Sequence, residues 1–304
     1  MRVAAIDCGT NSLRLLIADI DQGNFREIYR TMEVVRLGEG VDQNKTFKLE
    51  AIDRTLTALQ TFSQEITRRG VERIRFCATS ATRDATNRDL FIKGVEEILG
   101  ITPEVIPGTE EASLSFRGAT KELATAEGPF LVVDIGGGST EFVYGTANVI
   151  AARSVNVGCV RMAERHQLTS PLSESSRTAA IADIDAAIAK AASEVPLTKA
   201  RSVIAVAGTA TTVAAAALGL ETYDRYAIHL ARISAEKSHE IAHSFAAMTR
   251  SEIAALGFMH PGRVDVITAG SLVLSRIMSA TGAKEFIASE SDILDGMAWS
   301  LAEK

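Results

Sequence analysis

Apolar runs separated by short polar turns at the start of the chain are typical of strands joined by tight hairpins. Residues 2–20 contain two such runs on either side of the turn Gly9-Thr10-Asn11-Ser12. Residues 24–38 continue the pattern as a third strand. The chain is therefore predicted to begin with a meander of three strands.

Helical spacing replaces the strand pattern after this meander. Apolar residues recur every three or four positions over residues 47–68, which predicts an amphipathic helix with Thr46 as its N-cap. Residues 73–85 are predicted to form a strand followed by a loop. A second helix is expected to start at Asn87 and to end at Gly100, before another short extended piece.

The opening pattern then repeats in the middle of the chain. Residues 130–145 again consist of strand, turn and strand, and a third extended segment follows. Aligning Asp7–Ser12 with Asp134–Ser139 keeps the aspartate, the first glycine and the serine in register, and VVRLG (34–38) corresponds to SVNVG (154–158). Two lobes built on one plan explain the match, although a short glycine-rich turn can also recur by chance.

Helices and strands alternate in the remainder of the chain. This order, after meanders of strands, predicts an α/β fold with mixed sheets. The expected helices cover residues 173–195, 264–282 and 292–303, a turn followed by a helix is expected over residues 209–219, and the expected strands cover residues 202–208 and 285–289.

Composition and charge exclude several functional classes. The 304 residues are 46 % apolar, enough to fill two hydrophobic cores, and the net charge of -6 disfavours a protein that coats nucleic acid. No apolar run reaches the roughly 18 residues that a membrane span requires, and no signal peptide is recognisable. The three cysteines are scattered and lie in no metal-binding pattern. We therefore expect a cytoplasmic protein with reduced thiols and neither nucleic-acid nor membrane partners.

The two glycine-rich turns carry the most informative chemistry. Glycine lets a backbone approach an anion closely, and exposed N–H groups of such a turn form an anion-binding concavity. An aspartate precedes each turn and could hold a magnesium ion that bridges to phosphate oxygens. A tight hairpin capped by aspartate is the structural alternative. Neither turn fits GxxxxGK[ST], and the triple glycine lies between strands, which disfavours a P-loop or a dinucleotide-binding turn.

Five ordered motifs extend this interpretation to a family. The chain contains, in this order, AAIDCGTNSLRLLIADI, ATSATRDATN, VIPGTEEASLSFRGA, VVDIGGGSTEFV and VAGTATTVAAAALGLETYD. Together they resemble the exopolyphosphatase/guanosine pentaphosphatase family over essentially the whole chain. The family belongs to the actin, sugar-kinase and heat-shock-chaperone ATPase superfamily. The resemblance implies duplicated ribonuclease-H-like lobes with an interlobe cleft: residues 1–119, with a terminal helix at 291–304 packed back on them, and residues 120–290.

The resemblance also implies roles for individual residues. Glu111 corresponds to the base that activates the attacking water, although the residues alone do not separate it from Glu110, and either could be a solvated helix start. The family's acidic pair at the magnesium site corresponds to Asp134 and Glu141, with Asp7 on the other lobe. The positions that match phosphate contacts are Asn11, Ser12, Arg83, Gly136, Gly137, Gly138, Ser139 and Thr209.

These roles lead to a hypothesis of phosphoanhydride hydrolysis. Water activated by Glu111 would attack the terminal phosphorus of inorganic polyphosphate, with Mg²⁺ as cofactor. Guanosine pentaphosphate is the alternative substrate. A kinase, an actin-like assembly protein and a silent phosphate-ligand sensor are rivals from other classes. A homodimer is an expectation from the family alone.

Two departures from the family pattern bear on the substrate. Longer members carry a helical C-terminal region, for which this sequence has no room, so processivity on long chains is in question. An Arg-Glu-Gly that is frequent in the family is replaced here, where Leu294 and Asp295 precede the glycine.

Other basic residues are not placed by the sequence. Arg161, Arg165, Arg232 and Arg263 could line the path of a polyanion. A further pattern, His239 and His243 at helical spacing, is interpreted as a solvated helix face rather than a metal site.

Overall fold

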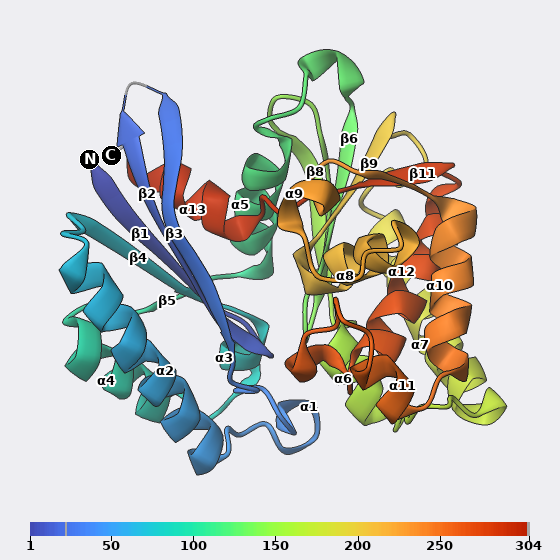
Figure 1. Cartoon of the computed structure of the whole chain (residues 1–304), viewed down its shortest axis with the longest axis horizontal. Helices are drawn as coiled ribbons and strands as arrows, with labels where there is room; N and C mark the ends of the chain where they lie inside the picture. Colours follow the sequence, from blue (N-terminus) through green and yellow to red (C-terminus); the bar gives the residue numbers. More distant parts are fainter. Residues whose placement is uncertain (22, 303–304) are drawn as a thin grey trace. The chain divides into compact units, whose positions relative to one another are not determined.

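The chain folds into two compact units. The computed structural model describes residues 1–21 and 23–302. One unit comprises Met1–Gly118 together with Ile293–Lys304, and the other comprises Ala119–Asp292. The chain therefore passes between the units twice, after Gly118 and after Asp292 (Figure 1).

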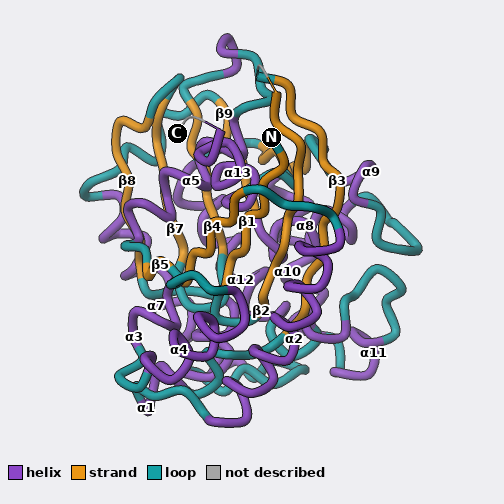
Figure 2. Tube along the Cα trace, turned by 90° about the vertical axis from the view of Figure 1, so that its left-hand side faces the viewer, coloured by secondary structure: helices purple, strands orange, loops and turns teal. Residues whose placement is uncertain are grey.

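A five-stranded mixed sheet forms the centre of the first unit, in the order β3-β2-β1-β4-β5 (Figure 1, Figure 2). The meander β1–β2–β3 is antiparallel, whereas β4 lies parallel to β1 and β5 parallel to β4. The strands are β1 (Arg2–Cys8), β2 (Ser12–Asp21), β3 (Asn24–Val34), β4 (Arg73–Ala78) and β5 (Glu104–Val105).

Helices cover both faces of this sheet. Ala4 and Ile6 of β1 belong to the core under α2 (Leu49–Arg68) and α4 (Arg88–Leu99). The alternate β1 residues Val3 and Ala5 belong to a second core, which contains α13 (Ile293–Ala302) and Leu114 of α5 (Gly108–Thr120). Because successive strand residues point to opposite faces, the continuous apolar run of β1 is explained by this two-sided burial.

Three local predictions in this unit need correction. The helix predicted over residues 47–68 begins at Leu49, and its N-cap position is occupied by Lys48 rather than Thr46. The side chain of Asn87 accepts a hydrogen bond from Phe47 N–H at 2.8 Å and donates one to Phe47 O at 3.0 Å, which holds Phe47 outside the helix. Asn87 therefore occupies the N-cap position of α4 without capping it through its side chain.

The third correction concerns the loop predicted after the fourth strand. It forms the short helix α3 (Ser80–Asp84). A further short helix, α1 (Val41–Asn44), was not predicted. Gly100 does end α4, in the left-handed conformation with φ 68° that glycine adopts without strain.

The second unit contains a six-stranded mixed sheet with the order β10-β11-β9-β6-β7-β8. Its meander β6–β7–β8 is antiparallel, and β9 lies parallel to β6, so the first four strands repeat the topology of β1–β4. This repetition confirms the predicted α/β fold with mixed sheets on one duplicated plan. The strands are β6 (Phe130–Ile135), β7 (Thr140–Gly145), β8 (Val149–Val155), β9 (Ser202–Val206), β10 (Arg232–Ser234) and β11 (Glu285–Ala288).

The buried helix α12 (Ile267–Thr281) lies at the centre of the helices of this unit. It packs against α6, α7, α8 and α10, and its apolar residues join one continuous core with β6, β7 and β9. The other helices are α6 (Cys159–Arg165), α7 (Glu174–Ala192), α8 (Ala207–Ala217), α9 (Arg225–Ile228), α10 (Ala235–Ala247) and α11 (Arg250–Ala254), with 3₁₀ turns η1 (Thr125–Glu127) and η2 (Pro261–Arg263). Within residues 1–21 and 23–302, no helix has the length and apolar character needed to cross a membrane.

The predicted solvated histidine face is only partly solvated. His243 is exposed, but His239 is half-buried and its Nδ1 lies 2.8 Å from the Ser275 hydroxyl of α12. Across the described residues, no group of three or more His, Cys, Asp or Glu side chains is arranged to hold a metal ion.

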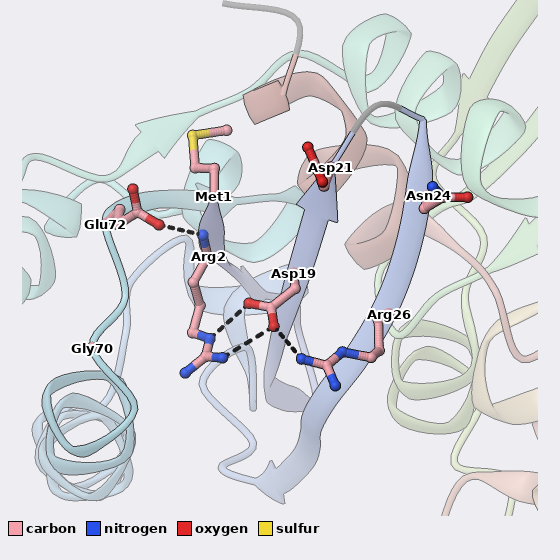
Figure 3. Close-up of a pocket in the computed structure, with 8 residues that line it drawn as sticks. All are labelled: Met1, Arg2, Asp19, Asp21, Asn24, Arg26, Gly70 and Glu72. Carbon is pink, nitrogen blue, oxygen red and sulfur yellow. Dashed lines mark hydrogen bonds and ion pairs between the residues drawn. The ribbon is translucent and has the colours of Figure 1, made fainter.

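An ion-pair network lines an open pocket at the start of β1 (Figure 3). Asp19 accepts hydrogen bonds from Arg2 at 2.7 and 3.0 Å and from Arg26 at 2.7 Å. The hydrogen bonds from Arg2 and then Arg26 lower the pKa of Asp19 below its usual range. None of the predicted site residues lines this pocket, which lies at the opposite end of β1 from the turn Gly9-Thr10-Asn11-Ser12.

We expect Asp19→Asn to destabilise the protein at pH 7 by about 1 kcal/mol, because the variant loses a charge shared by two guanidinium groups. A carboxyl whose folded-state pKa is lowered contributes stability above its unfolded pKa and loses it as the pH falls. The difference from wild type should therefore shrink progressively below about pH 4. Denaturant unfolding between pH 7 and pH 3 measures it, with Asp21→Asn, an exposed neighbour, as the control. A difference that stays constant over this range would contradict the interpretation.

All three cysteines, Cys8, Cys77 and Cys159, are free and buried. Burial raises the pKa of each thiol above its usual value. A raised pKa keeps a thiol protonated at neutral pH, and burial shields it from reagents. We expect no thiol of the native protein to react with a disulfide reagent at pH 8, whereas all three should react in guanidinium chloride. A rapidly reacting thiol in the native protein would show that one of these sites opens.

Candidate active site

In the first unit, the loop that follows β3 forms backbone hydrogen bonds to the turn Gly9-Thr10-Asn11-Ser12. Gly9 N–H donates to Ser12 O at 3.0 Å and closes the turn between β1 and β2. The Asn11 carbonyl accepts from the N–H groups of Val35 and Arg36 at 3.0 and 2.9 Å. These bonds point the turn's carbonyls toward the loop and so away from any anion that approaches the turn.

The turn of the second unit is held in the same way. Gly136 N–H donates to Ser139 O at 3.0 Å. The carbonyls of Gly136 and Gly137 accept from the N–H groups at the start of α6, at 2.9 to 3.0 Å. Arg161, which is 5 % exposed, donates through Nε to the Gly138 carbonyl at 2.5 Å. All three glycine carbonyls are thus occupied by α6.

Two N–H groups of this turn can receive an anion. Among the residues that the structure describes, no backbone oxygen accepts a hydrogen bond from Gly137 N–H or Gly138 N–H. Neighbouring N–H groups without an internal acceptor form a concavity suited to phosphate oxygens. The predicted phosphate contacts Gly136, Gly137, Gly138 and Ser139 therefore lie together on one hairpin.

A second glycine packs against each turn. A Cβ on Gly158 would lie 2.5 Å from the carbonyl carbon and oxygen of Gly137, and a Cβ on Gly38 would collide with Thr10. These are the last residues of the SVNVG and VVRLG segments that correspond in the sequence. The correspondence therefore has a physical reason, because only glycine lets the returning chain approach the turn so closely.

Two buried carboxylates face each other beside the triple-glycine turn. Asp134 of β6 lies directly opposite Glu141 of β7 in the antiparallel register, and the two residues are 6 % and 1 % exposed. Glu141 Oε1 also accepts a hydrogen bond from Ser154 Oγ of β8 at 2.7 Å. Carboxylate oxygens suit magnesium, which commonly binds one or two protein carboxylates and several waters. Asp134 and Glu141 together form a carboxylate row, whose oxygen donors fit the expected magnesium ion.

Asp7 has a different environment. Arg14 donates to Asp7 Oδ2 through Nη2 at 2.7 Å and through Nε at 3.0 Å. Asp7 is only 4 % exposed, and the Arg14 side chain is 19 % exposed. The Asp7 carboxylate is therefore engaged by a guanidinium of its own hairpin.

Glu111 and Glu110 are clearly distinguished by their surroundings. Both lie in the first turn of α5, where a helix N-terminus favours negative charge. Glu111 is buried, and its Oε2 accepts a hydrogen bond from Arg83 Nη1 at 2.7 Å. The Glu110 side chain is 42 % exposed and pairs with Arg75 at 2.5 Å. Glu110 is therefore a solvated residue at the start of the helix, whereas Glu111 is not.

Arg83 reaches Glu111 because their elements meet at one edge of the first sheet. Arg83 belongs to α3, which follows the carboxyl end of β4. Its Nη1 also donates to Ile106 O at 2.9 Å, just before α5 begins. Within this unit, Asn11 and Ser12 lie on the turn that follows β1, the strand paired with β4.

Thr209 lies near the carboxylate row of the second unit. Val206 at the end of β9 pairs with Asp134, and Thr209 follows in the first turn of α8, where it is buried. Ala207, the first residue of α8, has φ 67°, an unfavourable left-handed conformation for a non-glycine residue. Such backbone strain is frequent at functional sites, and here it directs the start of α8.

The four arginines considered for a polyanion path have separate environments. Arg161 binds the glycine turn, as described above. Arg263 lies against Gly208 and donates to Thr212 Oγ1 at 3.0 Å, beside the start of α8. Arg165 pairs with Asp183 at 2.8 Å, and Arg232 pairs with Glu127 and Glu285, each at 2.7 Å. Two of the four therefore lie beside the site residues of this unit, and two belong to surface ion pairs.

Sequence reasoning did not single out Arg14 or Ser154. Both become visible only when strand register is known, because Arg14 lies opposite Asp7 and Ser154 lies opposite Glu141. The available signal was the equal spacing of seven residues between Asp7 and Arg14 and between Asp134 and Glu141.

Comparisons with known proteins agree with this geometry. The model of the Ppx/GppA phosphatase family matches residues 16–304. Exopolyphosphatase 2 of Mycobacterium tuberculosis is 45 % identical, over 99 % of this chain and 98 % of that protein. The crystal structure of an exopolyphosphatase-like protein has a TM-score of 0.95 at 42 % identity, covering 100 % of this chain and 99 % of the other. An exopolyphosphatase from Cytophaga hutchinsonii has a TM-score of 0.91 at 26 % identity, covering 100 % and 98 %.

One relative bears the name of the alternative activity. A guanosine-5'-triphosphate,3'-diphosphate pyrophosphatase of Pseudoalteromonas atlantica is 37 % identical, over 59 % of this chain and 35 % of that protein. The matches to the exopolyphosphatases extend over nearly the whole of both chains. The family model and these full-length similarities together show that the chain belongs to the Ppx/GppA phosphatase family.

Proposed function

We propose that this protein is an exopolyphosphatase, which hydrolyses the terminal phosphoanhydride of inorganic polyphosphate and releases orthophosphate. The observation that carries the proposal is the 45 % identity, over nearly the full length of both chains, to Exopolyphosphatase 2 of Mycobacterium tuberculosis. The buried Glu111 and the glycine-lined turn supply the groups that this reaction needs.

Glu111 acts as the general base in this proposal. A carboxylate oxygen of Glu111 takes a proton from water, and the water oxygen forms a bond to the terminal phosphorus. The bond from phosphorus to the bridging oxygen breaks, so that polyphosphate one unit shorter leaves. Arg83 supports this role because its hydrogen bond to Glu111, at 2.7 Å, orients the carboxylate.

The glycine turn binds and orients phosphate oxygens. Gly137 and Gly138 present N–H groups, while α6 occupies the carbonyls that would repel an anion. Fixed N–H dipoles stabilise the charge on transferring phosphate without reorganising during the reaction. Asn11 and Ser12 on the other turn, with Ser139 and Thr209, are proposed as further phosphate contacts.

Asp134 and Glu141 are the proposed magnesium ligands. Their opposed positions and the hydrogen bond from Ser154 to Glu141 support this assignment. When bound, magnesium would neutralise charge on the phosphate oxygens.

Guanosine pentaphosphate is the second candidate substrate. The match to the Pseudoalteromonas atlantica pyrophosphatase supports it, but it covers a smaller part of both chains. We favour polyphosphate for that reason. A cytoplasmic location is also proposed, supported by the three free cysteines, since oxidising compartments favour disulfides. The homodimer is proposed on the family resemblance alone.

Phosphate release from matched concentrations of short polyphosphate, long polyphosphate and guanosine pentaphosphate tests the proposed substrate. With magnesium present, we expect orthophosphate from polyphosphate at a clearly higher rate than from the nucleotide. The chain-length profile will also show how far processivity extends. Release from guanosine pentaphosphate alone would replace the proposal with the alternative, and release from none of the three would overturn both.

Two neighbouring glutamates provide a matched test of the base. Glu111→Gln removes the proton acceptor and should lower the turnover number by about 10²- to 10⁴-fold. Glu110→Gln makes the same chemical change one residue away, where the side chain is exposed and bound to Arg75, and should leave turnover near that of wild type. Initial rates at saturating polyphosphate measure both. Equal losses in the two variants, or near-full turnover of Glu111→Gln, would contradict the assignment.

A further inference from the structure

The two hairpins have the same architecture but carry different side chains. Each turn closes with a glycine N–H to serine carbonyl bond of 3.0 Å, and in each the aspartate lies two residues before that glycine. In both units the aspartate, its partner on the next strand and that residue's partner on the third strand form one row across the sheet. The rows are Asp7, Arg14 and Met32 in the first unit, and Asp134, Glu141 and Ser154 in the second.

The row of the second unit consists of oxygen donors. Its two carboxylates are almost completely buried, and the Ser154 hydroxyl orients one of them at 2.7 Å. A side chain that orients a ligating carboxylate commonly strengthens metal binding. The row is therefore equipped to hold a hard divalent cation.

The row of the first unit lacks these features. Arg14 occupies the position of Glu141, and its guanidinium donates twice to Asp7 Oδ2. Met32 occupies the position of Ser154, and its thioether is a soft ligand that magnesium does not favour. The positive charge beside Asp7 is thus supplied by the chain itself.

We propose that the chain has one divalent-cation site, in the second unit, and that Arg14 is the fixed cation of the first unit in place of a metal ion. Asp7 then positions Arg14 and does not ligate the metal. The inference rests on the proposed function for the metal site of the second unit.

Arg14 lies where a fixed cation can act on phosphate. Ser12 and Arg14 are alternate residues of β2, so their side chains lie on the same face of the sheet. A guanidinium stays protonated at all ordinary pH values and carries five N–H donors. Its charge is therefore independent of the magnesium concentration.

Counting bound ions in the full-length protein tests the inference without measuring activity. Mn²⁺ is the probe, and the electron paramagnetic resonance signal of free Mn²⁺ gives the number bound per chain. We expect one ion for the wild type and none for the double variant Asp134→Asn, Glu141→Gln. Arg14→Glu recreates the carboxylate pair of the second unit and should bind two ions. Arg14→Lys keeps the charge and should bind one.

Several results would overturn the inference. Two ions in the wild type, with one lost in Asp7→Asn, would show that Asp7 is a ligand. A folded Arg14→Glu protein that binds only one ion would show that Arg14 does not exclude a metal, with folding checked by circular dichroism. If Arg14→Glu does not fold, Asp7→Asn decides: one bound ion supports the inference, and a lost ion overturns it. A wild type that binds no ion removes the metal site proposed for the second unit, and the Arg14→Glu count still decides the role of Arg14.

Discussion

Antiparallel register in the first hairpin of each unit is the constraint on which the candidate site depends. A slip of one residue would move Asp134 or Glu141 to the other face of the sheet, because strand side chains alternate. The register is secured by the closing bond from Gly136 to Ser139 and by the buried apolar residues on both faces of β6. The carboxylate row, the orientation of Ser154 and the shape of the glycine turn all follow from it.

Burying charged groups is costly unless each has a partner. The first unit pairs Asp7 with Arg14 and Glu111 with Arg83 through hydrogen bonds of 2.7 Å. The second unit places two acidic residues together, with the Ser154 hydroxyl bonded to one of them. One backbone plan therefore presents a fixed positive charge in one copy and a row of oxygen donors in the other.

Long-range contacts secure Glu111 as well. The helix α5 is crossed closely by α13, where a Cβ on Gly296 would collide with the Leu114 carbonyl. Arg75 of β4 binds both Glu110 in α5 and Ser300 in α13. The α5 helix therefore packs closely against the last helix of the chain, and an exposed ion pair at Glu110 joins it to the sheet.

Local signals in the sequence were sufficient for the fold class, the duplicated strands and most helices, because alternation, helical periodicity and glycine turns act over short distances. Asp134, Glu141 and the glycine turn could be singled out as candidates for the same reason. The tertiary structure alone distinguished Glu111 from Glu110, since the two differ in burial and in which arginine reaches them. Only the tertiary structure shows that α2 begins at Leu49, because the Asn87 side chain binds the backbone of Phe47 outside the helix. Both outcomes depend on residues distant in the sequence, whose proximity is created only when the chain packs.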